Sequence, residues 1–310
     1  MKQFLKVLPI PAAGVMLGLA ALGNLLQSYS EGVRLVFGAL ALVLWVCLVL
    51  KAVFCWKGVC QAMEDPIAAS VAGTFPMATM LLAVYAKPFA GAAAAQIIWL
   101  LGIALHVVLI VWFTVKFFGK FQLGRVFASY YIVYVGIVVA SLTAPAFDMA
   151  GTVGTCAFWF GFVCLIALLA LVTVRYVKLP VQKDPAKPIF CIYAAPVSLC
   201  LAGYIQSVSP KLPAMIIAML IVSTALYIVV LVRLPEYLKL PFYPSYAAFT
   251  FPMVITAIAA KQSMACLTGM GYAAGWLSPL VLAETVIAAV MVVYALIRYV
   301  MAVAKACKAA

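Results

Sequence analysis

The sequence predicts an all-α integral membrane protein with ten transmembrane helices that form five helical hairpins. Of its 310 residues, 69% are hydrophobic and only 9% are charged, and the mean hydropathy is +1.24. Soluble globular domains carry roughly 25% charged residues. A chain this apolar must bury its side chains in a lipid bilayer, and we expect one transmembrane domain over 1–310.

Membrane-spanning helices need about 20 consecutive apolar residues. The segments that meet this length are joined by short loops of Gly, Pro, Ser and charged residues. The first resembles a signal peptide, but Pro9 and Pro11 interrupt it, so we expect it to remain as a span. The predicted spans are 8–28, 33–54, 67–85, 92–115, 126–146, 153–174, 189–207, 213–232, 245–262 and 277–302.

The cations predict the orientation of these spans. The set of loops that includes both termini holds most of the 20 Lys and Arg residues, and the other set holds Arg34, Lys87, Lys211 and Lys261. Cytoplasmic loops are enriched in Lys and Arg. We therefore expect both termini in the cytoplasm and the protein in the plasma membrane, the inner membrane of a bacterial cell. This also explains the net charge of +13 without a nucleic-acid partner.

A short motif repeats in alternate spans. Thr-Phe-Pro-Met occurs at 74–77 and again at 250–253, and Ala-Ala-Pro-Val occurs at 194–197. Proline inside a helix removes a hydrogen bond and bends the helix. We expect aligned kinks at Pro76, Pro196 and Pro252, although prolines are also common in membrane helices generally. In the first and fifth spans Met16 and Val133 hold the proline position, so a kink there would come from Gly18 and Gly136.

Tryptophan distinguishes two kinds of span. All six Trp residues lie in the even-numbered spans or at their ends, whereas the first span is rich in Ala and Gly. Small residues allow close helix packing, and aromatic residues suit lipid headgroups. We expect the odd-numbered helices to form an inner pore ring and the even-numbered helices an outer ring.

Residues for catalysis are scarce. Enzyme motifs such as H-E-x-x-H or a nucleophile elbow are absent from the sequence, so we expect no enzyme, no metal and no cofactor. The single His106 is expected to be packed or hydrogen-bonded. Glu284 is an intramembrane acid, which we place near the outer interface within reach of water. A proton-coupling role for Glu284 stays open as an alternative.

The middles of the odd-numbered spans carry no charge, whereas cations lie at their ends. Lys211 and Lys261 are candidate mouth charges at the outer ends of the seventh and ninth spans. A neutral path with positive ends attracts anions without trapping them. The expected partners are therefore small inorganic anions and the lipid bilayer.

Two segments carry a family resemblance that covers essentially the whole chain. They are Leu-Gly-Leu-Ala-Ala-Leu at 17–22 and Ala-Phe-Thr-Phe-Pro-Met at 248–253. The sequence resembles the tellurite-resistance/dicarboxylate transporter family, which includes bacterial tellurite-resistance protein A and the plant slow-type anion channels.

The resemblance implies a homotrimer in which the five odd helices of each protomer surround a separate pore. It also implies that Phe251 occludes this pore. By the internal repeat, Phe75 is expected at a similar depth as a second gate residue. The family often has proline where this chain has Met16 and Val133, so the bends of those two helices differ from the family pattern.

Three functions follow from these observations. The first is a gated channel for small monovalent anions such as nitrate and chloride. The second is a secondary transporter of C4-dicarboxylates, sulfite or tellurite-type oxyanions, with or without proton coupling, although a dicarboxylate carrier would be expected to place Arg or Lys within the path. The third is a membrane enzyme that uses His106 or Glu284, against which the missing motifs argue.

Overall fold

The structure is a computed structural model that describes residues 2–119, 121–179, 181 and 183–309, all of them in helices, turns or coil and none in a strand. Within this part of the chain, eight helical stretches are long and apolar enough to cross a membrane. Two shorter apolar helices, Ala12–Leu26 and Val138–Phe147, lie in the two remaining predicted spans. The chain is therefore an all-α, multi-pass membrane protein, and the arrangement of ten spans in hairpins stays a prediction.

Five long helices are largely exposed. Only 22–39% of the residues in their most apolar windows are buried inside the molecule, and their exposed side chains are mostly large and apolar. Surfaces of this kind suit contact with lipid. They are α3 (Glu31–Phe54), α7 (Ala92–Phe113), α10 (Thr155–Lys178), α12 (Pro213–Leu238) and α14 (Ser278–Ala309).

Five other stretches are buried more completely, and each divides into consecutive helical segments. In the three that are long enough to span a membrane, 72–94% of the most apolar window is buried. The first stretch consists of α1 (Lys2–Val7) and α2 (Ala12–Leu26), and the second of α5 (Pro66–Val71) and α6 (Thr74–Ala90). The third consists of α8 (Tyr130–Tyr134), α9 (Val138–Thr143) and the 3₁₀ helix η3 (Ala144–Phe147). The fourth consists of the 3₁₀ helix η5 (Asp184–Ala194) and α11 (Ala195–Ser207), and the fifth of the 3₁₀ helix η6 (Pro244–Phe249) and α13 (Phe251–Gly269).

The remaining segments are short and join these stretches. A π-helical turn extends the end of α7, and another precedes α10. The short segments are α4 (Trp56–Ala62), η1 (Thr114–Phe118), η2 (Leu123–Arg125), η4 (Ala150–Gly154) and η7 (Gly275–Leu277).

The prolines of the repeated motif start helices. Pro196 and Pro252 are the second residues of α11 and α13, and Pro76 is the third residue of α6. Helix α11 directly follows the 3₁₀ segment η5, and Thr250 alone separates η6 from α13. The first turn of a helix has no intrahelical partner for its N–H groups, so proline fits there without the loss of a bond. The breaks therefore lie in front of the prolines, where the expectation was a bend within a continuous helix.

The helix backbone differs at the two glycines that were expected to replace the prolines, Gly18 and Gly136. The helix α2 runs without a break through Gly18. A Cβ atom on Gly18 would lie 2.5 Å from the Cβ of Thr250, so this glycine lets α2 approach the start of α13. At Gly136 the α-helix does stop, because α8 ends at Tyr134 and α9 begins at Val138.

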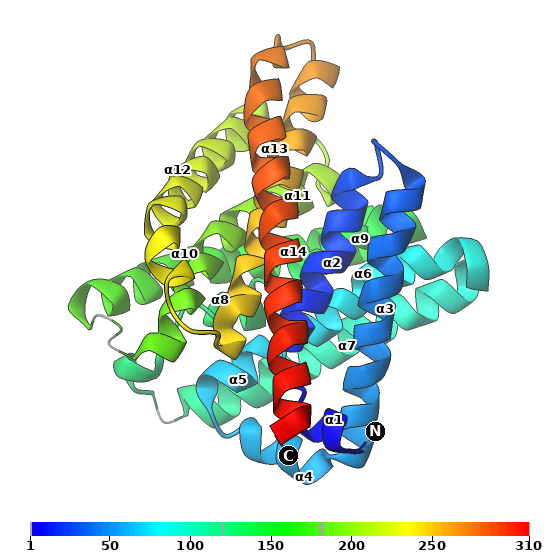
Figure 1. The fold of residues 1–310 in the computed structure, drawn as a ribbon. Helices are drawn as coiled ribbons and strands as arrows, with labels where there is room; N and C mark the ends of the chain where they lie inside the picture. The colour runs from blue at the N-terminus through cyan, green and yellow to red at the C-terminus, as the bar shows by residue number, and fades with distance from the viewer. Residues whose placement is uncertain (1, 120, 180, 182, 310) are drawn as a thin grey trace.

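The buried stretches close a ring. Helix α2 contacts α6, α6 contacts α9, α9 contacts α11, α11 contacts α13, and α13 contacts α2. The long helices pack outside it, with α3 on α2, α7 on α6, α10 on α9 and α11, α12 on α11 and α13, and α14 on α13 and α2. This arrangement (Figure 1) surrounds one common axis with buried helices.

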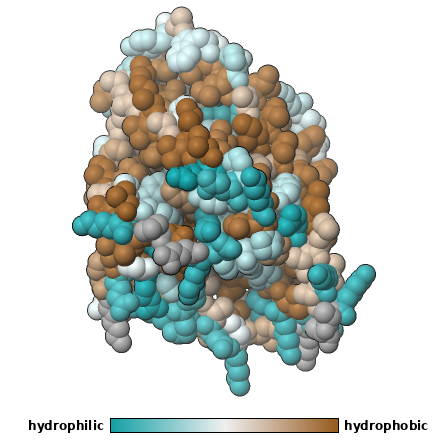
Figure 2. All heavy atoms as spheres, turned by 60° about the vertical axis from the view of Figure 1, so that its left-hand side comes forward, coloured by the Kyte–Doolittle hydropathy of each residue, from teal (hydrophilic) through white to brown (hydrophobic). Residues whose placement is uncertain are grey.

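Both termini lie at the same end of the molecule, next to α4 (Figure 1). We call this end the terminal face and the other end the opposite face. Figure 2 shows apolar side chains over the upper part of one side and hydrophilic ones gathered toward the lower part, where the terminal face lies. The division suits a protein with one end in water and its sides in lipid.

Candidate functional site

A cavity of about 340 Å³ lies on the axis of the ring and is lined by all five buried stretches. Most of its walls are apolar, because Ala, Gly, Ile, Val, Leu and Pro dominate the lining. In each of the five stretches, one lining residue lies farthest from the terminal face; these residues are Leu17, Met77, Gly136, Leu199 and Pro252. The cavity therefore enters the ring from the terminal face and does not continue past this level.

Phe251 lies at the inner end of this cavity. It is the first residue of α13, it lines the cavity, and it is 6% exposed. The 3₁₀ segment η6 ends two residues before it, and Thr250 between them has an irregular backbone. The hydroxyl of Thr250 donates to the carbonyl oxygens of Gly14 (2.9 Å) and Ala247 (2.7 Å). The bond to Gly14 ties the junction that carries Phe251 to α2.

Phe75 lies elsewhere. Its ring stacks on that of Trp45 in α3, with centroids 6.0 Å apart and an interplanar angle of 16°. It borders a groove on the outside of the ring and is not part of the axial cavity. The neighbours Thr74 and Met77 face the cavity in its place. The expectation that Phe75 faces the axis is therefore wrong. Helices α6 and α13 turn different sides of the shared motif toward the axial cavity.

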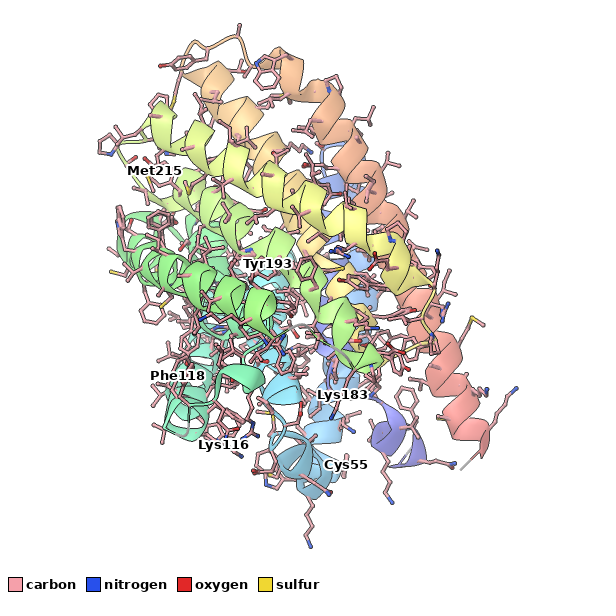
Figure 3. All side chains as sticks on the ribbon, turned by 90° about the vertical axis from the view of Figure 1, so that its left-hand side faces the viewer. Cys55, Lys116, Phe118, Lys183, Tyr193 and Met215 are labelled. Atoms are coloured by element: carbon pink, nitrogen blue, oxygen red, sulfur yellow. The ribbon has the colours of Figure 1, made fainter. Side chains whose placement is uncertain are left out.

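Two charged side chains lie at the mouth of the cavity on the terminal face. Asp65 and Lys183 are both exposed and both line it. The Asp65 carboxylate caps α5 by accepting the N–H groups of Ile67 and Ala68, each at 2.9 Å. Figure 3 shows Lys183 in the lower part of the molecule, below Tyr193 and Met215. One negative and one positive side chain therefore lie at the mouth of the cavity.

Lysines at the opposite face bind the ends of neighbouring helices. The ammonium of Lys261 donates to the carbonyl of Leu25 (3.0 Å), near the end of α2, and to the Ser28 hydroxyl (2.5 Å). Lys87 likewise donates to the carbonyl of Ala146 in η3 (2.5 Å). Cations stabilise the negative ends of helices. Lys261, one of the two candidate mouth charges, therefore stabilises the end of α2. The other candidate, Lys211, is half-buried.

His106 is packed in the interior, as its place in the sequence predicts. The side chain is fully buried, and its Nε2 atom lies 3.0 Å from the carbonyl oxygen of Val133. A Cβ atom on Gly136 would come within 2.9 Å of the imidazole ring. The histidine therefore joins α7 to the break between α8 and α9, and it does not line the axial cavity.

Glu284 departs from its predicted environment. It is 1% exposed, and within the described chain neither carboxylate oxygen has a hydrogen-bond partner. The expectation that water reaches this side chain is wrong, because the side chain is buried on α14, a helix that packs on α13 and α2. Tyr227 in α12 and Ser263 in α13 are also buried with unpaired hydroxyl groups. Glu284 is not among the residues that line the axial cavity.

Most of the residues that line the axial cavity were not predicted from the sequence. Two further prolines near the starts of these spans, Pro185 as the second residue of η5 and Pro244 as the first residue of η6, indicated that each span begins with a separate helical segment. Asp65 directly before Pro66 was a second such signal in the sequence, because aspartate followed by proline is typical of the start of a helix.

One family profile matches nearly the whole chain. The family described as SLAC1, voltage-dependent anion channel, matches residues 8–302. No curated protein matches the chain significantly.

Proposed function

Because the chain belongs to the SLAC1 family of voltage-dependent anion channels, we propose that it conducts small monovalent anions through the axial cavity of each protomer. We further propose that Phe251 occludes this path. Membership of a family of anion transporters supports anion transport in general. The conducted ion and the gate are the parts that need an experiment.

The observation that carries the proposal is a cavity shared by all five buried stretches that ends at the level of Phe251. Beyond that level the same helices are closely packed, with Ala21, Met80 and Ile255 at most 1% exposed. Hydrophobic constrictions stop ions by excluding water. The arrangement supports a closed path in which the large apolar ring of Phe251 is the first obstacle.

Helix ends favour an anion over a cation in this cavity. Four helices of 13 to 19 residues start at the cavity, namely α2, α6, α11 and α13. Their first turns contribute Gly14, Thr74, Pro196 and Pro252 to its lining. The N-terminal end of a helix carries a partial positive charge. Anions can therefore be attracted into an apolar cavity without a lysine or arginine in its middle.

This lining predicts a selectivity order. An anion that enters an apolar cavity loses hydration, and no full counter-charge at depth compensates for the loss. Weakly hydrated nitrate should therefore carry more current than chloride, and sulfate should carry little. Reversal potentials of the purified protein in planar bilayers with nitrate, chloride and sulfate gradients measure this order. If sulfate or malate carried most of the current, the apolar cavity would not be the selectivity element.

The two charges at the mouth predict opposite effects on conductance. Asp65→Asn removes a negative charge but keeps a good helix cap, so it should increase anion conductance at low salt. Lys183→Gln removes a positive charge and should decrease it. Each change should be about twofold to fivefold, because a surface charge contributes roughly 0.5–1 kcal/mol. Single-channel recording in dilute and in concentrated salt tests this, since salt should remove both effects.

Secondary transport coupled to protons is the second candidate function. The buried, unpaired carboxyl of Glu284 favours it, because intramembrane acids often carry protons. Its position outside the axial cavity argues for the channel. The same bilayer experiment separates the two, because a proton-coupled transporter shifts its reversal potential when a pH gradient is applied and a channel for nitrate or chloride does not.

A further inference from the structure

A second cavity, of about 390 Å³, opens on the side of the molecule between α3 and α7. We call it the α3–α7 groove. The junction of α5 and α6 forms its back wall, and α4 closes it toward the terminal face. It is lined by Ile10, Ala13, Leu48, Lys51, Ala52, Trp56, Val59, Met63, Ala72, Phe75, Pro76, Leu105, Val108, Leu109 and Trp112.

The groove opens at the outer surface of the transmembrane helices, where the protein would contact lipid. Val108 and Leu105 on α7 are 64% and 50% exposed, and Trp56 at the start of α4 is 62% exposed. All but one of the lining side chains are apolar or aromatic. The volume falls in the range of sites for small molecules. In a bilayer, a hydrocarbon chain is the material that fills such a groove.

The exception in the lining is Lys51, which is buried in spite of its charge. It is 8% exposed, and its ammonium donates to the carbonyl oxygens of Leu5 (2.8 Å) and Lys6 (3.3 Å) at the end of α1. None of the ion pairs in the described chain involves Lys51. A buried charge is costly unless it is paired. The carbonyl oxygens at the end of α1 compensate for part of this cost, but no carboxylate in the described chain pairs with Lys51. The groove therefore holds a positive charge that an anion from outside the chain could balance.

Other cations and tryptophans surround the same end of the groove. Lys57 follows Trp56 and is exposed. The ammonium of Lys116 lies 4.9 Å from the ring centroid of Trp112, and it pairs with Glu64 at 2.5 Å. Figure 3 shows Lys116 and Cys55, the neighbour of Trp56, both in the lower part of the molecule, toward the terminal face. Tryptophans of this kind mark the headgroup level of a membrane.

We propose that the α3–α7 groove binds one anionic phospholipid, with an acyl chain along the groove and its phosphate near Lys51 and Lys57. Basic pockets between transmembrane helices are suited to anionic headgroups. An apolar groove that ends in cations matches a lipid, whereas a free phosphate would leave the groove unfilled. Phe75 and Pro76 in the back wall are next to Thr74 and Met77 in the axial cavity, so the lipid lies against the outer side of the wall of that cavity.

A second lateral groove provides the control. It has a volume of about 350 Å³ and lies between α1, α2, α3 and α14. Its lining includes Phe4, Leu44, Tyr299, Val300 and Cys307, and none of the described residues that line it is charged. Lipid chains in this groove should show no preference for an anionic headgroup.

The test is native mass spectrometry of the purified full chain with phosphatidylglycerol and phosphatidylcholine that have identical acyl chains. The wild type should retain one phosphatidylglycerol in preference to phosphatidylcholine. Lys51→Met should weaken phosphatidylglycerol binding about fivefold, because one cation near the headgroup contributes roughly 1 kcal/mol, and should leave phosphatidylcholine unchanged. Lys51→Arg keeps the charge and should keep the preference, which separates loss of charge from loss of the contact with α1.

Blocking the groove gives a test that does not depend on Lys51. Val108→Trp and Val300→Trp both enlarge an exposed valine on a long helix, at 64% and 59% exposure, in the α3–α7 groove and in the control groove respectively. Only Val108→Trp should abolish the preferred phosphatidylglycerol. Equal retention of both lipids by the wild type, or an unchanged preference in Val108→Trp, would overturn the proposal.

Two further outcomes would assign the groove to another occupant. If inorganic phosphate at the same concentration displaced the lipid, the site would recognise a free anion. If Val108→Trp changed the number of subunits and left lipid binding intact, a second copy of the chain would cover the groove. Binding is measured without any current, so the result does not depend on whether the axial cavity conducts.

Discussion

Truncation of Phe251 to alanine is expected to increase the basal anion current by roughly ten- to a hundredfold. The ring lies at the inner end of the axial cavity, so its removal should let water continue past the level at which the cavity now stops. The estimate equates the barrier with the ~1.5–3 kcal/mol needed to move a phenylalanine side chain out of an apolar environment. Phe251→Leu should give an intermediate current. Bilayer recording from purified variants measures all of these currents.

Phe75→Ala is the matched control for this experiment. It removes the same ring from the same tetrapeptide, but Phe75 stacks on Trp45 outside the axial cavity. The variant should therefore show little change in basal current, even if it unfolds more easily. An equal rise in both variants would mean that loosened packing opens the channel. An unchanged current in Phe251→Ala would show that this residue is not the gate.

Gly18→Ala is expected to destabilise the protein by about 1–3 kcal/mol, the usual cost of an overpacked interior. The new methyl group would lie 2.5 Å from the Cβ of Thr250 and 3.2 Å from the backbone nitrogen of Phe251. Helix propensity alone favours alanine over glycine by roughly 1 kcal/mol, so a destabilised variant would show that the close approach dominates. Thermal melting in detergent, followed by size-exclusion chromatography, measures the change.

Gly58→Ala in α4 is the control, because no atom lies within 4 Å of the added methyl group. It should melt at the wild-type temperature or slightly above. If Gly18→Ala melted like this control, the junction before Phe251 would be able to move away from α2. In that case its basal current should differ from that of the wild type, since Phe251, the proposed gate, would have moved with the junction.

The sequence was sufficient to predict the membrane class, because that class depends on long apolar runs, and eight long apolar helices in the described chain agree with it. The ten spans and their pairing in hairpins stay predictions. The alternation of buried and exposed helices also followed from local composition, with Ala and Gly in the first span and Trp in the even ones. Trp99 is an exception: it is fully buried and donates to the Thr143 hydroxyl at 2.7 Å. A hydrogen-bond partner on another helix cannot be identified from composition.

The parts of the site that the sequence did not predict depend on helix rotation. The motif at 74–77 and its copy at 250–253 have identical letters, yet one phenylalanine faces the axis and the other faces α3. The rotation is set by what precedes each motif, a turn after α5 in one case and the 3₁₀ helix η6 in the other. The burial of Glu284 likewise depends on how α14 packs against its neighbours, which the hydropathy of α14 alone cannot determine.

If the axial cavity conducts anions as proposed, the distribution of cations at its two ends predicts that the current rectifies. At the opposite face, Arg34 pairs with Glu31, and Lys87 and Lys261 donate to backbone carbonyl groups of neighbouring helices. At the terminal face, the exposed Lys183 lies at the mouth of the axial cavity. Anions should therefore accumulate at one mouth more than at the other, and the current–voltage relation in symmetrical salt should be steeper when anions enter from the terminal face.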